Sequence, residues 1–386
     1  MKVLKTVAYF IISTLIFLVC IAFFTGNMHI FKAVSATYFA GQNGPGLDDK
    51  EKFYNNKIVA PQKKNAWKVS KNYNASTLNS TDLKLMEVYK PSAFVVVKND
   101  SLLFEKYWPL HDEKSTTNSF SMAKSFVSLM IGKAIEEELI SGVDQRASDF
   151  LPEWKNNKNV NVTIEQLLTM TSNIVFDENY TNAFGYQAKV YYGSHLRDET
   201  LGFELVGEPG TTWEYLGGNT IALSLIIEKA TGKTLSNYFS EKFWQPMGAE
   251  ADAFWTTDTE DGIEKASCCF YAMARDFAKI GQLCLDSGAV NGNQIINKKY
   301  LSQSFAPVNV PDKNGNPVNY YGYQWWMTSY KGMQVNMARG ILGQYIMMIP
   351  EKKLVIVRLG SGRSDKYINE FPTDVFLYLD IALKMI

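Results

Sequence analysis

The sequence predicts an α+β fold in which helices flank a central antiparallel sheet and a mainly helical part is inserted into the chain. Runs rich in β-branched and aromatic residues lie at 93–108 and again at 321–359, while the segment 140–300 between them has mainly helical periodicity. Strands at both ends of the globular region can share one core if the helices between them form an insertion. An uncharged apolar run over 7–24 adds an N-terminal helix long enough to cross a membrane.

We expect three regions along the chain: an N-terminal transmembrane anchor or signal, a spacer with an irregular lead-in, and one globular domain. The spacer is rich in Asn, Lys and Gly and has few periodic apolar runs. The globular domain divides into an α/β part, drawn from two separate stretches, and a helical part. The boundaries are 1–26, 27–90 and 91–386, with the α/β part at about 91–140 and 305–386 and the helical part at about 141–304.

The apolar run follows Lys2 and Lys5, a charge pattern that favours an amino end in the cytoplasm and the rest of the chain outside. We therefore expect a membrane-anchored protein on the periplasmic or cell-surface side. Two alternatives stay open. A cleaved signal peptide would give a secreted protein, but its best cleavage site, Val34-Ser-Ala36, lies far past the apolar run. A lipoprotein signal would need Cys20, whose neighbours are apolar.

The composition argues against a nucleic-acid partner and gives no support for a metal or another cofactor. The 39 basic and 39 acidic residues balance, and no dense basic stripe is present. The four cysteines do not form a disulfide framework. Because neither Cys-x-x-Cys nor His-Glu-x-x-His occurs, we expect no zinc and no cofactor.

The first strands are predicted at 93–98 and 101–108, with Asn99-Asp100 as a hairpin turn between them. The stretch Ser119–Ile135 has apolar residues at the three- and four-residue spacing of a largely buried helix. A long polar and aromatic segment, 176–212, has weak periodicity, and we expect it to be a functional lid.

Capping residues mark two further helices. Thr163 is the expected N-cap of 164–170, while Asn219 opens 220–230 and Gly232 ends it. Other helices are predicted at 235–244, 272–285 and 374–385, and short strands at 321–327, 333–337, 344–349 and 354–359, the last two joined by a turn at Pro350–Lys353.

Ser121 and Lys124 lie one turn apart near the start of the buried helix, so the hydroxyl and the amine can meet. Free N–H groups and the helix dipole at that end favour an oxyanion. Apolar neighbours and the same dipole favour the neutral amine that a general base needs. We predict that Ser121 is a nucleophile and Lys124 its base; a capping serine beside a surface lysine is the structural alternative.

The histidines argue against a Ser–His–Asp triad. There are three, His29, His111 and His195, and the last two lie in polar contexts that are typical of exposed residues. No Gly-x-Ser-x-Gly nucleophile elbow is present. If the chain is a serine enzyme, lysine is the better candidate base.

Two other stretches hold candidates for the same chemistry. Tyr215 lies between a Pro-Gly turn and a capped helix, where its phenol could shuttle a proton or simply pack beside Trp213. Gly340 and Gly343 would let a substrate approach a strand backbone, whose N–H could complete an oxyanion hole with that of Ser121. Bulges and turns would also account for these glycines.

These stretches, in this order, resemble the penicillin-recognising serine hydrolase superfamily, which contains serine β-lactamases, DD-peptidases and related esterases. The resemblance runs from about Ala93 to the carboxyl end, and within it the likeness is greatest to the aminohexanoate-oligomer (nylon-oligomer) hydrolase branch. It implies a β-lactamase/transpeptidase-like fold. The residues that carry it are Ser121-Met-Ala-Lys-Ser125, Leu167-Leu-Thr-Met-Thr171, Cys268-Cys269 ahead of Ala274-Arg-Asp276, Tyr323-Gln-Trp-Trp326 and Gly340-Ile-Leu-Gly-Gln-Tyr345.

The resemblance also implies roles for individual residues. Ser121 would be acylated, Lys124 would be its general base, and Tyr215 would pass the proton to the leaving group. The N–H groups of Ser121 and Ile341 would form the oxyanion hole, and Tyr180 would contact amide substrates from the lid.

Two departures from the family pattern concern substrate binding. The third position after Tyr215 is Gly217 where the family has Asn or Ser, and Asn219 is the nearest candidate to replace it. Ala338-Arg-Gly340 stands where the family has Lys-Thr-Gly or His-x-Gly, so the leading cation, which lies near the substrate carboxylate in β-lactamases and DD-peptidases, is missing. Arg339 could substitute for it, or strand alternation could point it away.

The sequence therefore predicts a membrane-tethered, extracytoplasmic serine hydrolase that cleaves a small-molecule or peptide-like ester or amide through an acyl-enzyme. Two alternatives stay open: a catalytically silent relative that binds peptidoglycan or another ligand, and a zinc or Ser–His–Asp hydrolase, which the motifs disfavour. The identity of the acyl group is not predicted.

Overall fold

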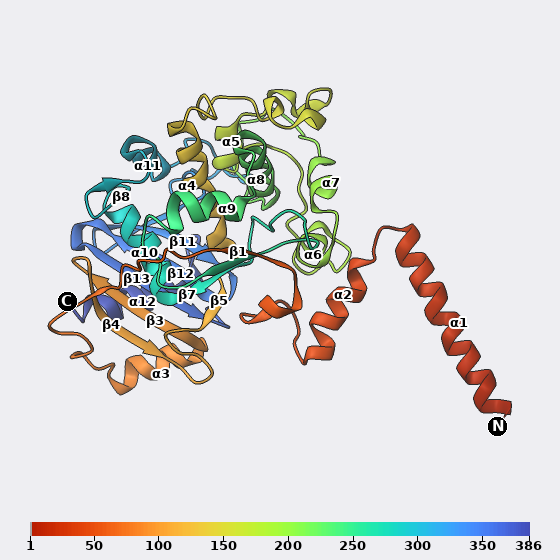
Figure 1. Cartoon of the computed structure of the whole chain (residues 1–386), viewed down its shortest axis with the longest axis horizontal. Coiled ribbons are helices and arrows are strands. Elements are labelled where there is room, and N and C mark those ends of the chain that lie inside the picture. The colour runs from red at the N-terminus through yellow and green to blue at the C-terminus, as the bar shows by residue number, and fades with distance from the viewer. Residues whose placement is uncertain (1) are drawn as a thin grey trace.

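A seven-stranded sheet forms the centre of the computed structural model, which describes residues 2–386 (Figure 1). Its order is β10-β11-β12-β13-β3-β4-β2, and every pair of neighbours is antiparallel except β2 and β4. The two ends of the globular region meet where β13 pairs with β3, which confirms the predicted α+β fold with a central antiparallel sheet. The strands are β2 (Lys68–Val69), β3 (Pro91–Lys98), β4 (Ser101–Tyr107), β10 (Trp326–Tyr330), β11 (Met333–Gly340), β12 (Gln344–Ile349) and β13 (Leu354–Gly360).

Alternation along the central strands sends side chains into two hydrophobic cores, one on each face of the sheet. Val95 and Val97 join the core that contains α4 (Ala123–Glu136) and α10 (Ala274–Leu285). Phe94 and Val96 join the core on the other face, which α3 (Ser80–Val88) and α12 (Thr373–Leu383) cover. Because both faces are buried, β3 reads in the sequence as one apolar run.

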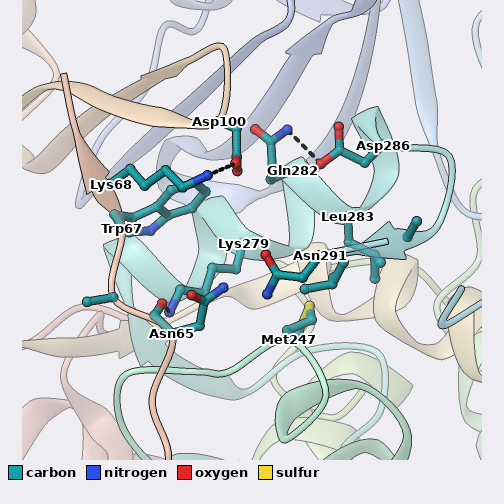
Figure 2. A pocket seen from close by; sticks show the side chains of 13 residues that line it. Asn65, Trp67, Lys68, Asp100, Met247, Lys279, Gln282, Leu283, Asp286 and Asn291 are labelled. Carbon is teal, nitrogen blue, oxygen red and sulfur yellow. Dashed lines mark hydrogen bonds and ion pairs between the residues drawn. The ribbon is translucent and has the colours of Figure 1, made fainter. Parts of the chain in front are cut away.

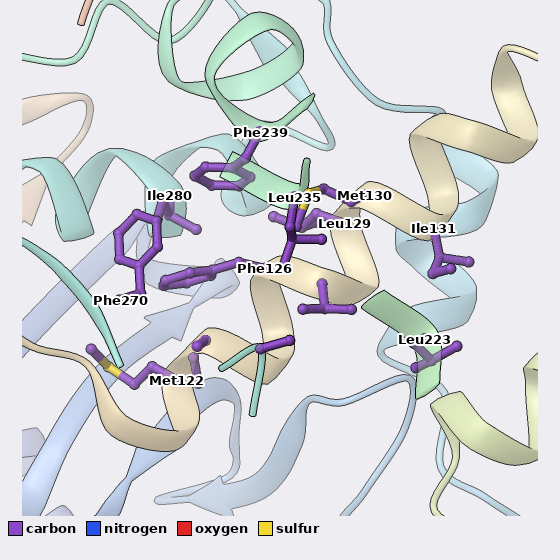
Figure 3. Packing of buried hydrophobic residues seen from close by; sticks show 14 of the residues in the cluster. Met122, Phe126, Leu129, Met130, Ile131, Leu223, Leu235, Phe239, Phe270 and Ile280 are labelled. Carbon is purple, nitrogen blue, oxygen red and sulfur yellow. The ribbon is translucent and has the colours of Figure 1, made fainter. Parts of the chain in front are cut away.

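The helical part is built around α4. The Phe126 ring of this helix lies 5.9 Å from that of Phe239 and 5.0 Å from that of Phe270, measured between centroids (Figure 3). The helix α8 (Gly218–Thr231) packs along α4, and every residue from Ala123 to Gly132 is buried. Each large apolar side chain buried there stabilises the fold by about 1.5–3 kcal/mol, so the first turns of α4 are firmly positioned.

Most predicted helix boundaries are reproduced. Thr163 caps α5 (Ile164–Leu168) through a capping box, and Gly232, at φ 67°, ends α8. Asn219 does not open α8, because the helix already begins at Gly218. The segment 176–212, predicted as a loop, contains two helices too short to show clear periodicity. The remaining short helices are α6 (Tyr186–Tyr192), α7 (Leu196–Leu201), α9 (Leu235–Phe239), which continues as a π-helical turn at Ser240–Trp244, and α11 (Lys298–Ser304).

The region 27–90, expected as spacer and lead-in, contributes elements to the globular body. The helix α2 (His29–Ala36) packs against α6, and β1 (Asn55–Ile58) is an edge strand of a second sheet with the order β1-β6-β7-β5. The sequence Asn-Asn-Lys-Ile of β1 buries only its last residue, so it carries no alternating apolar signal. The other strands of this sheet are β5 (Thr116–Asn118), β6 (Ala253–Thr256) and β7 (Phe270–Met273).

The N-terminal helix α1 (Lys2–Phe24) extends away from the globular body (Figure 1). Among the described residues, Val3–Phe24 is the one helical stretch with the length and composition to cross a membrane, and none of it is buried inside the protein. A membrane anchor and a signal sequence both fit this observation.

The carboxyl group of Glu228 in α8 makes the stability of the fold depend on pH. Burial and the neighbouring Glu264 raise the pKa of Glu228 from 4.5 to about 8. A raised pKa adds stability that is full below the unfolded value and is lost as the pH rises through the folded value. Relative to Glu228→Gln, the wild-type melting temperature should therefore fall as the pH is raised from about 5 to about 8. Thermal melts of both proteins in detergent measure this difference. The melting temperature of Glu87→Gln, at an exposed glutamate of α3, should change with pH as that of the wild type does. A difference in melting temperature between Glu228→Gln and the wild type that stayed constant with pH would contradict the assignment.

Candidate active site

Ser121 lies in a 3₁₀ turn, Phe120–Met122, between β5 and α4. The chain reaches this turn from the second sheet, because the Ser119 N–H donates to the Phe270 carbonyl of β7 at 2.8 Å. Phe120 has φ 44°, a left-handed conformation that is costly for a bulky residue. The main chain is thus bent sharply just before Ser121, whose side chain lines a cavity.

Lys124 contacts Ser121 as the helical spacing predicts. Its Nζ lies 3.0 Å from Ser121 Oγ and donates to the carbonyl oxygen of Ser267 at 2.8 Å. The lysine is 3% exposed and has no carboxylate partner among the described residues. Ser267 directly precedes a disulfide between the adjacent residues Cys268 and Cys269, on the loop that leads into β7. The structural alternative of a capping serine beside a surface lysine does not fit, because Lys124 is buried and its amine contacts the Ser121 hydroxyl.

Tyr215 lies on another side of Lys124. Its ring centroid is 5.1 Å from Lys124 Nζ, and the ring packs against Tyr321 and Trp326. The phenol has no hydrogen-bond partner among residues 2–386. Packing thus orients the ring against the amine, although Tyr215 is not among the residues that line the cavity of Ser121.

Gly340 brings the end of β11 to the turn that holds Ser121. A Cβ atom at Gly340 would lie 2.4 Å from the Ser119 carbonyl oxygen, so only glycine permits this approach. Ile341, the next residue, lines the same cavity as Ser121. Both candidate oxyanion-hole residues therefore line one cavity.

That cavity has a volume of about 680 Å³ and opens to solvent. Tyr180, which lines it, is 55% exposed and lies at its rim. Its walls come from the segment that follows α1, from α6, from the Ser267 loop and from the end of the sheet. The larger and more polar side chains among the lining residues belong to Thr37, Tyr38, Phe120, Ser121, Lys124, Tyr180, Gln187, Tyr191, Tyr192, Cys268, Ile341 and Arg363.

Besides Gly340, two predicted substrate-binding residues lie outside this lining. Asn219 is fully buried in α8, where its Oδ1 accepts a hydrogen bond from Ser172 at 2.6 Å. Gly343 packs on the guanidinium of Arg358, which donates to the carbonyl oxygens of Leu342 (2.9 Å) and Gly343 (2.7 Å). Both residues are occupied in supporting the fold around the site.

Glu178 is a candidate that motif analysis missed. Its Oε2 accepts from the Gly217 N–H at 2.6 Å and from Gln187 at 2.7 Å, and its Oε1 accepts from the Tyr180 hydroxyl at 2.5 Å. Burial raises the pKa of this carboxyl, and the nearby Lys124 opposes that shift. A Cβ at Gly217 would touch the carboxylate at 3.4 Å, so Glu178 occupies space beside the residue that departs from the family pattern.

The two arginines near the sheet end differ in position. The guanidinium of Arg339 stacks on Trp326, 3.5 Å from its ring centroid, donates to the Glu370 carbonyl, and does not line the cavity. Arg363, on the loop after β13, does line it and has no hydrogen bond or ion pair with any described residue. The cation in the cavity therefore comes from outside the Ala338-Arg-Gly340 motif. A half-buried arginine in a loop carries no sequence signal that would have identified it.

A second cavity, of about 270 Å³, lies beside α10 and has no candidate nucleophile with a neighbouring base (Figure 2). Lys68 pairs with Asp100, Gln282 bonds Asp286, and Lys279 donates to a main-chain oxygen, so its polar groups satisfy one another. No serine, cysteine or tyrosine lines it. Across residues 2–386, no group of three or more His, Cys, Asp or Glu side chains could hold a metal ion.

Comparison with known proteins gives one family match. A family model described as beta-lactamase matches residues 89–369, which is most of the chain. The 6-aminohexanoate-dimer hydrolase of Paenarthrobacter ureafaciens is 26% identical over 290 residues, covering 70% of this chain and 72% of that protein. Protein flp of Staphylococcus aureus (strain MW2) is 27% identical, but over 43% of this chain and only 35% of its own length.

Solved structures show the same fold. A 6-aminohexanoate-dimer hydrolase homologue from Bacillus anthracis superimposes with a TM-score of 0.73 at 26% identity, covering 87% of this chain and 92% of that one. A family VIII carboxylesterase superimposes with a TM-score of 0.63 at 17% identity, covering 79% and 95% of the two chains.

Glu178 offers a direct test of how the lid is held to the site. In Glu178→Gln one acceptor oxygen becomes an NH₂ group, which cannot accept from Gly217, Gln187 or Tyr180, so at least one of the three hydrogen bonds is lost. We expect kcat/KM for a short-chain ester to fall about tenfold, the equivalent of one lost hydrogen bond to a charged group. Steady-state kinetics measure this, with Glu208→Gln at an exposed glutamate as the matched control. Equal activities for the two variants would show that Glu178 does not hold the lid.

Proposed function

The chain belongs to the beta-lactamase family and is a serine hydrolase of that fold, and we propose that it cleaves an ester or amide through an acyl-enzyme on Ser121. The motif resemblance found in the sequence is thereby confirmed at the level of the family. The observation that carries the proposal is the 3.0 Å contact between Lys124 Nζ and Ser121 Oγ at the wall of an open cavity.

In the acylation step, the neutral amine of Lys124 accepts the Ser121 proton while Oγ forms a bond to the substrate carbonyl carbon. The N–H groups of Ser121 and Ile341 stabilise the oxyanion that develops on the carbonyl oxygen. The C–N or C–O bond to the leaving group then breaks, and the proton moves from Lys124 through the Tyr215 hydroxyl to that group. Water attacks the acyl-enzyme, returns a proton to Ser121, and releases the acid.

The cavity and the relatives support two candidate substrate classes. A relative acts on an aminohexanoate dimer, which makes a linear amide one candidate for this chain, and short-chain esters are the other. Arg363 supplies a cation at the cavity wall, so a substrate with a carboxylate beyond its scissile bond would find a partner there. The alternative of a silent protein that binds peptidoglycan or another ligand predicts binding without an acyl-enzyme.

We further propose that the protein acts outside the cytoplasm, tethered by α1. The apolar helix and the two lysines in its first turns support this placement. If the helix were instead a signal that is cleaved, the same domain would be secreted.

Ser121 and Lys124 should be separable in a covalent-labelling experiment. A fluorophosphonate probe should label the full-length protein and fail to label Ser121→Ala, because the Ser121 hydroxyl is the group that the Lys124 amine contacts at the cavity wall. Lys124→Ala should abolish labelling while its circular dichroism spectrum stays that of the wild type. Labelling of Ser121→Ala at the wild-type rate would refute the nucleophile. Normal acylation of Lys124→Ala would refute the base.

Tyr215→Phe tests the proton shuttle. The ring packing against Trp326 and Tyr321 is retained in this variant, so only the hydroxyl is lost. We expect kcat to fall by about 10²–10⁴-fold, the range for loss of an acid–base group. Turnover of a short-chain ester measures the effect. Trp213→Phe, a change in a neighbouring ring, is the packing control. Unchanged turnover in Tyr215→Phe would mean that Tyr215 only packs.

A further inference from the structure

The wall of the active-site cavity is built partly from the segment that leaves the membrane-spanning helix. Ala33 and Thr37 of α2 and its C-terminal end, together with Tyr38 and residues 43–45, line the same cavity as Ser121. Ala33 and Ala36 also belong to one apolar cluster with Phe120, which precedes the candidate nucleophile, and with Ile341, a candidate oxyanion-hole residue. The segment is therefore part of the site as well as its tether.

The segment is fixed to the globular body. His29 is buried, and its Nε2 hydrogen-bonds the Ala183 carbonyl at 2.9 Å. At the other end of α2, the Lys52 ammonium donates to the Ala36 carbonyl at 2.7 Å. Between these contacts α2 packs along α6, as Figure 1 shows. The body cannot move away from α2 without breaking these contacts.

The distance from α2 to the end of α1 is short. Four residues, 25–28, separate Phe24 from His29, so even a fully extended connection spans at most about 18 Å. When α1 lies in a bilayer, α2 and the mouth of the cavity are therefore held at or next to the lipid surface. Gly26, at φ 69°, lies in this connection and forms the left-handed turn at the end of α1.

Exposed aromatic side chains lie in or next to the segments that line the cavity on this side. Phe39 is 84% exposed and Phe184 is 62% exposed, although both are large and apolar. Phe184 follows Ala183, which bonds α2, and Phe39 follows Tyr38, which lines the cavity. Aromatic rings gather at membrane–water interfaces, where their apolar bodies contact lipid. We define the residues Phe31, Tyr38, Phe39, Tyr180 and Phe184 as the aromatic rim.

We propose that the aromatic rim docks on the bilayer that holds α1, and that the substrate is a membrane-embedded amphiphile whose ester or amide reaches Ser121 through this mouth. The substrate part of the inference rests on the proposed function. The apolar lining beside the nucleophile, from Ala33, Phe120 and Ile341, would receive the acyl chain. The exposed aromatic side chains, the short tether and the shared cavity wall all favour lipid as the occupant of this surface.

Photo-crosslinking tests the docking without any catalysis. Full-length Ser121→Ala protein is placed in nanodiscs that contain a phospholipid with a diazirine near its glycerol, and crosslinked residues are mapped by mass spectrometry. We expect labels on α1, on 38–41 and on 183–185, and none on the exposed apolar residues Leu85 and Val88 of α3. Labels confined to α1, or absent from it, would overturn the proposal. If the aromatic rim were protected from labelling to a degree that rose with protein concentration and did not depend on lipid, the surface would be assigned to contact with a second copy of the chain.

A kinetic comparison tests the substrate class. We expect Phe39→Ser/Phe184→Ser to lower kcat/KM at least about tenfold for a long-chain ester embedded in nanodiscs, and to leave a water-soluble short-chain ester within about twofold. Leu85→Ser/Val88→Ser, which removes the same number of exposed apolar side chains, should change neither. Equal losses on both esters, or no loss on the embedded one, would overturn the substrate assignment. If the unmodified protein hydrolysed neither ester, the proposed function would fail, and the crosslinking result would still decide the docking.

Discussion

The buried amine of Lys124, held between two oxygens, is the interaction on which the rest of the site depends. A lysine that is only 3% exposed is tolerated when its hydrogen-bonding groups have partners. One partner, Ser121 Oγ, comes from the turn before α4, and the other, the Ser267 carbonyl, comes from the loop before β7. The apolar packing of α4 and the pairing of β5 with β7 therefore meet at this one side chain. A shift of either element would leave a buried amine unsatisfied.

Two parts of the family motif have been redistributed over the chain. Gly217 has no side chain to offer beside Tyr215, and the Glu178 carboxylate reaches its N–H from the lid. Ala338 offers no cation, Arg339 is held on Trp326, and Arg363, from the loop after β13, lines the cavity. The Glu178 carboxyl also accepts from Gln187, so it joins two parts of the segment 176–212 to the main chain beside Tyr215.

The sequence was informative where local chemistry decides the structure. The Asn99-Asp100 turn, with φ of 51° and 58°, the Thr163 capping box and the Ser121–Lys124 spacing were all predicted from neighbouring residues. It was uninformative where partners are distant along the chain. The β1 strand pairs with β6 about 200 residues away, Glu178 and Arg363 belong to no motif, and α2, which falls in the expected spacer, lines the cavity. Asn219 shows the opposite case. It lies near a motif, but its side chain is hydrogen-bonded to the buried Ser172 and does not line the cavity.

The buried guanidinium of Arg358 has a further consequence. From the interior of β13 it donates to the carbonyl oxygens of Leu342 and Gly343, and on its other side to that of Tyr89. The backbone beside Ile341 is thus fixed from within the sheet, whereas much of the cavity wall comes from α2, α6 and the Ser267 loop. These wall segments can change independently of the backbone beside Ile341, because they are separate parts of the chain, and a changed wall would alter which acyl group fits the proposed site. Such a division lets one chemistry be inherited while substrate preference drifts, and it makes Arg358 a position where a change would impair every substrate alike.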